Sequence, residues 1–285
     1  MSLNKLFSVI VTIIILSTSS TLYSFDYYTS TKAIGMGGAY SLAGDDNGLI
    51  TGNPAGVADS HKLSLSGLYS RTNDNLNTSY VNLSMIDSAL NPNLAGGLTY
   101  TRFFNDGEES NKIKLEDIYF ELAEHYTDYT YIGIGVRRIR NFNPYEKNYD
   151  LNFGVIVKFN NNFSLGAAGY NLLKYQCPFF QREAEFSAAF NIMDMVKGEV
   201  DWLQNIETTD WNQENAIIKG GLTVIILEQI GIQAGYNYAF ANNGNSYSGG
   251  ISWDFPQGGI GYAIKYNNDS SFSHVFMLQY HPELY

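Results

Sequence analysis

The sequence predicts an all-β fold: a transmembrane antiparallel β-barrel of about 14 strands with an N-terminal luminal plug. The first observation is composition, because 22 Tyr, 17 Phe and 27 Gly with only 16% charged residues favour strands, tight turns and aromatic girdles over helices. The second is a series of segments of roughly ten residues with alternating apolar and polar side chains, which is the signature of a membrane barrel. The third is a segment without alternation that directly precedes them.

Residues 1–24 are predicted to be a signal peptide. Lys5 precedes an apolar run from Leu6 to Leu16, and a small polar tract follows as far as Ser24, which is the layout of a secretory signal. The run is shorter than the ~20 apolar residues that a spanning helix needs. We expect cleavage near Ser20 or Ser24 and export to the cell outer membrane, with an uncleaved N-terminal anchor as the alternative.

Residues 25–61 are predicted to form the plug. The segment is dense in Gly and Ala and does not alternate. Gly35, Gly37 and Gly38 allow close backbone approach and positive φ, while Pro54 fixes a turn that Asn53 stabilises by hydrogen bonds to neighbouring backbone. A barrel of this size has room for such a segment in its lumen.

Two sharper interpretations of this segment fail on spacing. The glycines do not fit a nucleotide-binding GxGxxG turn, and no strand of a βαβ unit precedes them. Asp45 and Asp46 do not fit the calcium loop of an EF-hand. We therefore expect these two aspartates to be a solvated or capping pair.

Residues 62–285 are predicted to form the barrel. Its ninth strand is the least regular, because Met195 to Asn205 alternates poorly and carries Lys197, Glu199 and Asp201, and twelve strands are the alternative. Strands are expected near 62–71, 78–87, 93–104, 112–124, 129–140, 148–160, 163–174, 182–193, 195–203, 215–226, 229–240, 245–256, 258–267 and 272–281.

The connections and faces of these strands predict an orientation. Tight connections such as 160–162 alternate with longer ones such as 105–111 and 141–147, as expected of periplasmic turns and external loops. The alternation places several charged residues on the lumen side, where we expect a hydrated lining: Asp150, Lys158, Glu183, Glu185, Lys219 and Lys265. A soluble β-sandwich is disfavoured because its strands are shorter.

Composition also limits the chemistry. A formal charge of −11 argues against nucleic acid as a partner, because binding a polyanion needs a basic surface. A single cysteine, Cys177, excludes an internal disulfide. The histidines His61, His125, His274 and His281 lie far apart and outside known catalytic motifs. We therefore predict no enzyme activity, no cofactor and no metal.

The run AIGMGGAYSLAGDDNGLITGNPAGVA resembles the N-terminal signature of PorV/PorQ-like proteins and related spirochaetal barrels, within the FadL-like outer-membrane transport superfamily. The matching residues are Gly35, Met36, Gly37, Gly38, Ala39, Asn53, Pro54 and Ala55. The resemblance implies a structural role for these residues in the plug.

The resemblance also implies a function: passive transport of small hydrophobic compounds, such as fatty acids, with outer-membrane lipid and the ligand as partners. The alternative it implies is docking to secretion-system proteins in a surface-attachment system. An apolar tunnel that reaches a gap in the barrel wall would favour transport, whereas an occluded lumen with an exposed apolar patch would favour docking. The external connections are short, which argues against capture of long-chain fatty acids.

Overall fold

A computed structural model describes residues 28–60, 62–74, 77–91, 93–105, 114–142, 145–173, 181–206, 216–240 and 244–282, with only the backbone of 141, 142 and 145–147. The predicted signal peptide, His61 and Cys177 lie outside these ranges. The strands are β1 (Leu63–Asn73), β2 (Ser79–Asp87), β3 (Leu94–Phe104), β4 (Lys114–Thr127), β5 (Thr130–Phe142), β6 (Tyr145–Asn160), β7 (Phe163–Tyr170), β8 (Glu183–Ile192), β9 (Val196–Asn205), β10 (Ala216–Ile226), β11 (Ile230–Ala239), β12 (Gly244–Phe255), β13 (Gly258–Asn267) and β14 (Phe272–Tyr280).

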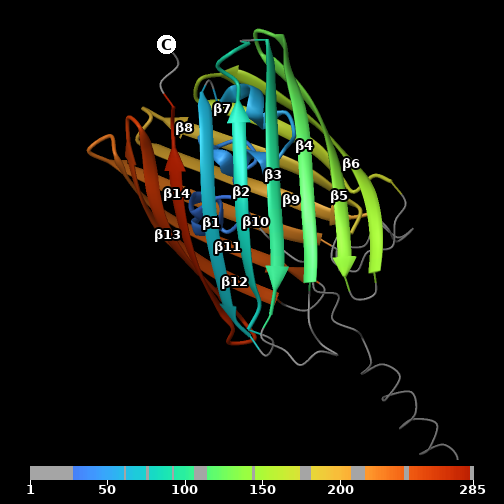
Figure 1. The fold of residues 1–285 in the computed structure, drawn as a ribbon. Helices are drawn as coiled ribbons and strands as arrows, with labels where there is room; N and C mark the ends of the chain where they lie inside the picture. The colour runs from blue at the N-terminus through green and yellow to red at the C-terminus, as the bar shows by residue number, and fades with distance from the viewer. Residues whose placement is uncertain are drawn as a thin grey trace, which may run out of the picture.

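The 14 strands form one closed barrel in which each strand pairs with its sequence neighbours and β1 pairs with β14 (Figure 1). All pairs are antiparallel, so the predicted fold class is confirmed and the twelve-strand alternative is wrong. Among the residues that the structure describes, no helix is long and apolar enough to span a membrane.

Side chains alternate between the lumen and the outside along each strand. In β6, Tyr149, Phe153 and Phe159 are exposed, whereas Asp150 and Asn152 are buried. The outer surface is therefore an apolar band, as expected of a lipid-facing barrel. Its exposed aromatic residues include Tyr69, Phe104, Tyr149, Tyr236, Tyr247 and Tyr266 toward one end, Tyr126, Phe159, Phe163, Phe190, Trp253 and Tyr280 toward the other, and Phe120, Phe153, Phe186 and Phe276 nearer mid-height.

The two ends of the barrel differ in their connections. The turn end holds connections 88–93, 128–129, 161–162, 193–195, 227–229 and 256–257, the start of β1 and the end of β14; the loop end holds the others. The predicted long loop 141–147 is wrong, because the β5–β6 ladder continues until Phe142 pairs with Tyr145. Strand pairing satisfies the backbone hydrogen bonds of these residues. The predicted alternation of short turns and long loops therefore holds only in part.

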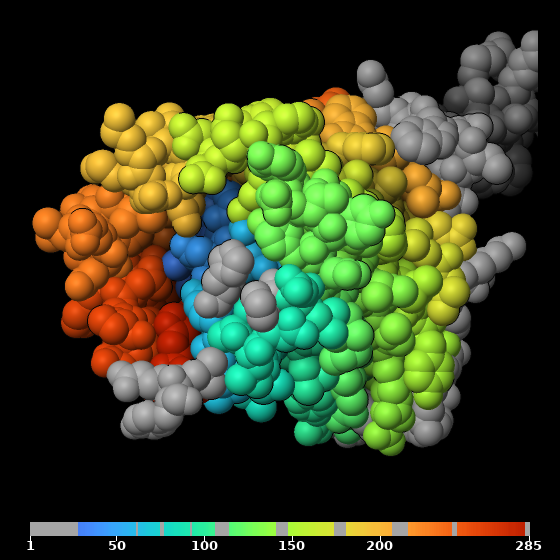
Figure 2. Space-filling view, turned by 90° about the horizontal axis from the view of Figure 1, so that it is seen from above, coloured from blue at the N-terminus to red at the C-terminus, as the bar shows by residue number. Residues whose placement is uncertain are grey.

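The N-terminal residues 28–60, called the plug below, lie inside the barrel (Figure 2). They contain a short helix, α2 (Thr31–Gly35), and two 3-10 turns, η1 (Asn47–Thr51) and η2 (Gly56–Asp59). Ser30 caps α2 by accepting hydrogen bonds from the Lys32 and Ala33 N–H groups. Apolar plug residues, among them Leu49 and Val57, pack against inward-facing wall residues such as Ile156.

The outward face gives the first prediction. Leu222 lies near the middle of β10 and is 40% exposed, so an arginine there would be forced into the lipid core. We expect Leu222→Arg to lower the unfolding free energy in lipid vesicles by about 2–4 kcal/mol, and Asn73→Arg, at a strand end, by about 0–1 kcal/mol. Urea titration measures both variants, and equal small effects would show that this face is not in lipid.

The plug and its docking sites in the lumen

The Asn53–Ala55 segment, called the NPA turn, ties the plug to two strands at once. The Asn53 side-chain oxygen accepts a hydrogen bond from the Ala55 N–H at 3.0 Å, which is the local turn bond expected of asparagine. Its amide nitrogen donates to the carbonyl of Val155 in β6 and to that of Ala167 in β7, both at 3.1 Å. The single Asn53 side chain thus binds across the β6–β7 ladder, a contact that sequence reasoning missed.

The wall beneath the NPA turn is made of glycine. A Cβ atom on Gly133 of β5 would overlap the Pro54 carbonyl group, and one on Gly154 of β6 would overlap the Asn53 side-chain oxygen. Any larger residue would push the turn off the wall. These two inward glycines make room for the NPA turn, although they lie far from it in the sequence.

The Gly35–Ala39 segment, called the GMGGA loop, docks on a second glycine surface. Gly37 and Gly38 have φ values of +70° and +88°, a conformation that favours glycine. A Cβ atom on Gly221 of β10 would overlap the Met36 carbonyl, and one on Gly235 of β11 would overlap the Gly37 nitrogen. The eight motif residues therefore gather at two separate docking points on the inner wall, and both depend on wall glycines.

Between the two motifs, carboxylates of the wall hold the plug backbone. Glu199 of β9 accepts hydrogen bonds from the consecutive N–H groups of Ser41, Leu42 and Ala43, at 2.7, 3.0 and 2.6 Å. Glu185 of β8 accepts one from the Ser41 hydroxyl at 2.5 Å. We call these two residues the carboxylate clamp. Charge-assisted bonds of this kind are roughly twice as strong as neutral ones, and both carboxylates are buried.

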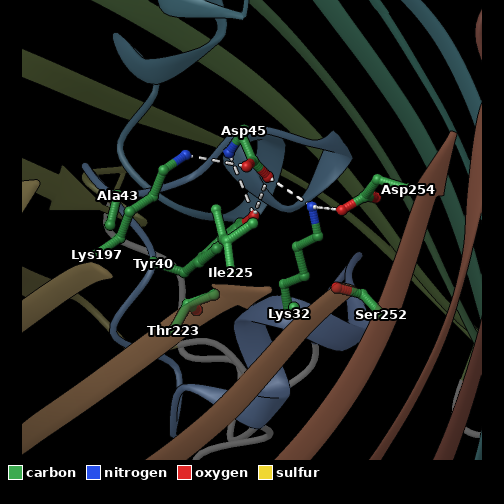
Figure 3. A pocket seen from close by; sticks show the side chains of 10 residues that line it. Lys32, Tyr40, Ala43, Asp45, Lys197, Thr223, Ile225, Ser252 and Asp254 are labelled. Carbon is green, nitrogen blue, oxygen red and sulfur yellow. Dashed lines mark hydrogen bonds and ion pairs between the residues drawn. The ribbon is translucent and has the colours of Figure 1, made fainter. Parts of the chain in front are cut away.

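An ion-pair network closes the turn-end side of the plug (Figure 3). The Lys32 ammonium lies 2.9 Å from Asp45 and 2.9 Å from Asp254 of β12, and Lys197 of β9 lies 3.0 Å from the other Asp45 oxygen. We call these four residues the ionic latch. Burial raises the pKa of Asp45, but the ammonium groups of Lys32, Lys197 and Lys62 outweigh it and hold that pKa well below its ordinary value.

Lys32 has the opposite balance. Burial lowers its pKa, but the carboxylates of Asp45, Asp46 and Asp254 outweigh burial and raise the pKa above its ordinary value. Both latch groups are thus held in their charged forms. Asp46 itself caps η1, accepting the Gly48 N–H at 2.8 Å. The expected capping role therefore describes Asp46, whereas Asp45 is an ion-pair residue.

The charged residues predicted to line a hydrated lumen lie mostly against the plug or within the wall. Lys158 pairs with Asp59 of the plug at 2.5 Å, Glu185 belongs to the clamp, and Asp150 accepts the Leu173 N–H at 3.0 Å. Lys219 is buried with its ammonium 5.8 Å from the Tyr28 ring, and Glu183 and Lys265 are half-buried. Most of these predicted lumen-lining residues are therefore surrounded by protein atoms rather than by water. Glu199 and Lys197 were missed as site residues.

Two of the described histidines contact tyrosine side chains. No group of three or more His, Cys, Asp or Glu side chains within the described ranges could hold a metal ion. His125 stacks on Tyr131, and His274 hydrogen-bonds the Tyr262 hydroxyl at 2.7 Å on the outer face.

β7 is the shortest strand of the barrel, so its ladder with β6 is short. This ladder pairs 153–160 with 163–169, whereas the β5–β6 ladder extends from Phe142–Tyr145 to Thr130–Val157. In the described chain the loop-end half of β6 thus has no β7 partner, and residues 171–173 lie beside it; we call this place the wall notch. Leu172 N–H donates to the Leu151 carbonyl at 2.9 Å, and the Arg137 guanidinium donates to the Asn171 side chain at 3.2 Å.

One side of the lumen carries an apolar cluster toward the loop end. Inward residues of β1 to β5, β13 and β14 pack with Ile34 of α2 in one cluster, called the inner apolar cluster: Leu68, Tyr80, Phe103, Leu115, Ile139, Ala263, Val275 and Met277. Most lie in the loop-end halves of their strands. The described cavity at the latch is different, since it is polar and at about 10 Å³ has room for roughly one water.

No family model and no curated protein matches the chain. Among solved structures, the CymD monoaromatic hydrocarbon channel is similar at 12% identity, covering 90% of this chain and 97% of that chain with a TM-score of 0.65. The P. putida toluene transporter TodX is similar at 11% identity, with 92% and 100% covered and a TM-score of 0.66. A Pseudomonas aeruginosa FadL homologue matches at 12% identity, with 90% and 98% covered and a TM-score of 0.60. These likenesses show a shared fold.

The docking contacts give the second prediction. In planar bilayers, we expect low steady ion conductance from the wild type and frequent openings from Asn53→Ala and Glu199→Gln, because each variant removes bonds that join the plug to the wall. Loss of the charged acceptor should weaken docking by about 2 kcal/mol. Glu124→Gln removes an exposed outward carboxylate and is the matched control. Equal conductance in all four folded proteins would refute plug docking as the closure.

The latch gives the third prediction, on pH. Since the pKa of Asp45 is lowered, its stabilisation of the docked plug is present above about pH 4 and is lost as the pH falls through the lowered pKa. The raised pKa of Lys32 keeps its contribution present below about pH 10. Conductance should therefore stay low from about pH 5 to 9 and rise on acidification below about pH 4. Asp45→Asn should reduce this step, and an unchanged step would exclude Asp45.

Proposed function

We propose that the protein is an outer-membrane channel for passive passage of small hydrophobic compounds, fatty acids among them. The inner apolar cluster carries this proposal, because aqueous pores of this architecture have polar interiors. Here the inward residues of β1 to β5, β13 and β14 include Leu, Ile, Val, Met and Phe side chains that pack together around Ile34. Such a cluster suits contact with apolar molecules.

The similar folds support this reading. Two of the similar structures are titled a monoaromatic hydrocarbon channel and a toluene transporter. The third is titled a FadL homologue, which agrees with the resemblance carried by the GMGGA and NPA motifs. Localisation in the outer membrane and export by a cleaved signal peptide of residues 1–24 belong to the same proposal, as do a plug at 25–61 and a barrel at 62–285.

A route follows from the arrangement of cluster, plug and notch. A hydrophobic compound entering at the loop end would meet the inner apolar cluster, while the docked plug blocks the way to the turn end. The wall notch offers a lateral exit if residues 171–173 move, because the polar contacts of Arg137 and Asn171 close it from inside. The plug then blocks water while the notch admits the ligand to the membrane.

A second function, docking of secretion-system proteins, rests on a different observation. Met193 and Leu227 occupy tight turns at the turn end, with φ values of +54° at both residues, and are 84% and 80% exposed. Asn or Gly would adopt this backbone at lower cost. Large apolar side chains held outward beyond the strands suit contact with another protein.

Uptake by cells that lack their own hydrophobic-compound channels tests the transport proposal. We expect wild-type protein to increase uptake of radiolabelled toluene and of a short-chain fatty acid, and Leu115→Asn/Val275→Asn to reduce it about tenfold, the scale of one large apolar side chain lost from a binding surface. Leu65→Thr/Val136→Thr is the control. It changes exposed outward residues of β1 and β5 and should leave uptake intact. A folded wild type that takes up neither compound would refute transport and favour docking.

A further inference from the structure

Among the side chains that the structure describes, those charged and on the outer face all lie on one side of the barrel. On β6 to β14, the outward positions whose side chains the structure describes hold no Asp, Glu, Lys or Arg. On β1 to β5, the outward positions hold Arg71, Asp87, Arg102, Lys114, Glu116, Glu124, Arg138 and Arg140. The outer surface is thus asymmetric around the barrel axis.

The sign of these charges depends on their height. All five cations, Arg71, Arg102, Lys114, Arg138 and Arg140, lie in the loop-end halves of their strands, whereas Asp87 and Glu124 lie toward the turn end. Glu116 is the one outward acid in the loop half of the described β1–β5 surface. We call the five cations the basic surface.

Cross-strand register brings the cations close together. Arg102 of β3 pairs with Glu116 of β4, and Glu116 pairs with Arg140 of β5. In the adjoining row, Arg138 of β5 pairs with Ile118 of β4, and Ile118 pairs with Tyr100 of β3. Strands are about 4.8 Å apart, so three guanidinium groups reach one area of roughly 10 Å.

The single acid does not neutralise this area. Glu116 accepts a hydrogen bond from the Tyr100 hydroxyl at 3.1 Å and lies 3.7 Å from Arg140. Arg102 is exposed and Arg138 half-buried; neither makes an ion pair with the described part of the chain, and the Arg138 Nε is buried without a hydrogen-bond partner. Within the described part of the chain, two guanidinium groups are therefore available for an anion.

The surroundings of the basic surface identify the kind of anion. Directly toward mid-height on the same strands, Leu98, Ile134 and Val136 are exposed outward and suit acyl chains. Arginine binds phosphate through paired N–H groups, and basic residues at the edge of a membrane protein's apolar band attract anionic headgroups. We propose that the basic surface binds the phosphate of an anionic lipid at the loop-end boundary of the membrane.

Native mass spectrometry of the full protein, with phosphatidylglycerol and phosphatidylcholine titrated into the same micelles, tests this site. We expect wild type to retain phosphatidylglycerol preferentially. Arg102→Gln/Arg138→Gln should weaken that binding about 25-fold, at roughly fivefold for each basic residue near an anionic surface. Glu116→Gln should strengthen phosphatidylglycerol binding, because the variant neutralises the one described acid that lies among the five cations.

Asp87→Asn/Glu124→Gln is the matched control, since it neutralises two outward charges on the same side at the other end and should not weaken phosphatidylglycerol binding. Circular dichroism and heat-dependent gel mobility establish that each variant is folded. Unchanged phosphatidylglycerol binding in a folded Arg102→Gln/Arg138→Gln protein would overturn the proposal. Displacement of the lipid by millimolar inorganic phosphate would also overturn it, because the site would then recognise a free ion rather than a membrane lipid.

Discussion

The rest of the structure depends on how the plug backbone is satisfied inside the lumen. A barrel of 14 strands encloses more space than its own inward side chains fill, so a second segment must occupy it. That segment forms only short helical turns, and many of its N–H groups have no partner within the plug. The wall therefore supplies acceptors, and Glu199 alone takes three consecutive N–H groups. Burial of this carboxylate is tolerated because those bonds replace its hydration.

The same requirement explains what could be predicted from the sequence. Strand periodicity depends on neighbouring residues only, so fourteen segments and their faces were recognisable. The β9 segment looked irregular because Lys197, Glu199 and Asp201 interrupt the expected polar-neutral lumen face. Structure shows that the first two of these residues hold the plug. Charged residues at every second position on one face of this strand were thus the sequence signal of the docking site.

Other parts of the site depend on pairs that are distant in the chain. Gly154 and Gly235 are ordinary strand glycines by sequence, yet each leaves room for one plug motif. No local pattern links Gly154 to Asn53, because the close approach exists only after the barrel closes. The 141–147 connection was misassigned for a local reason, since Asn and Pro there suggest a loop while pairing of β5 with β6 continues. The eight motif residues were found because they lie in one continuous run.

The distribution of the docking contacts favours an all-or-none release of the plug. The NPA turn engages β6 and β7, the clamp engages β8 and β9, and the latch engages β9 and β12. The contacts are linked along the chain, because Ser41 to Ala43 and Asp45 lie between the two motifs. A buried charge left without its partner costs several kcal/mol, so partly released states are disfavoured. Residues 171–173 at the wall notch are held by separate contacts: backbone bonds, the Arg137–Asn171 bond and the Leu173 N–H donated to the Asp150 carboxylate. These contacts do not involve the plug, so movement of this segment does not require release of the plug.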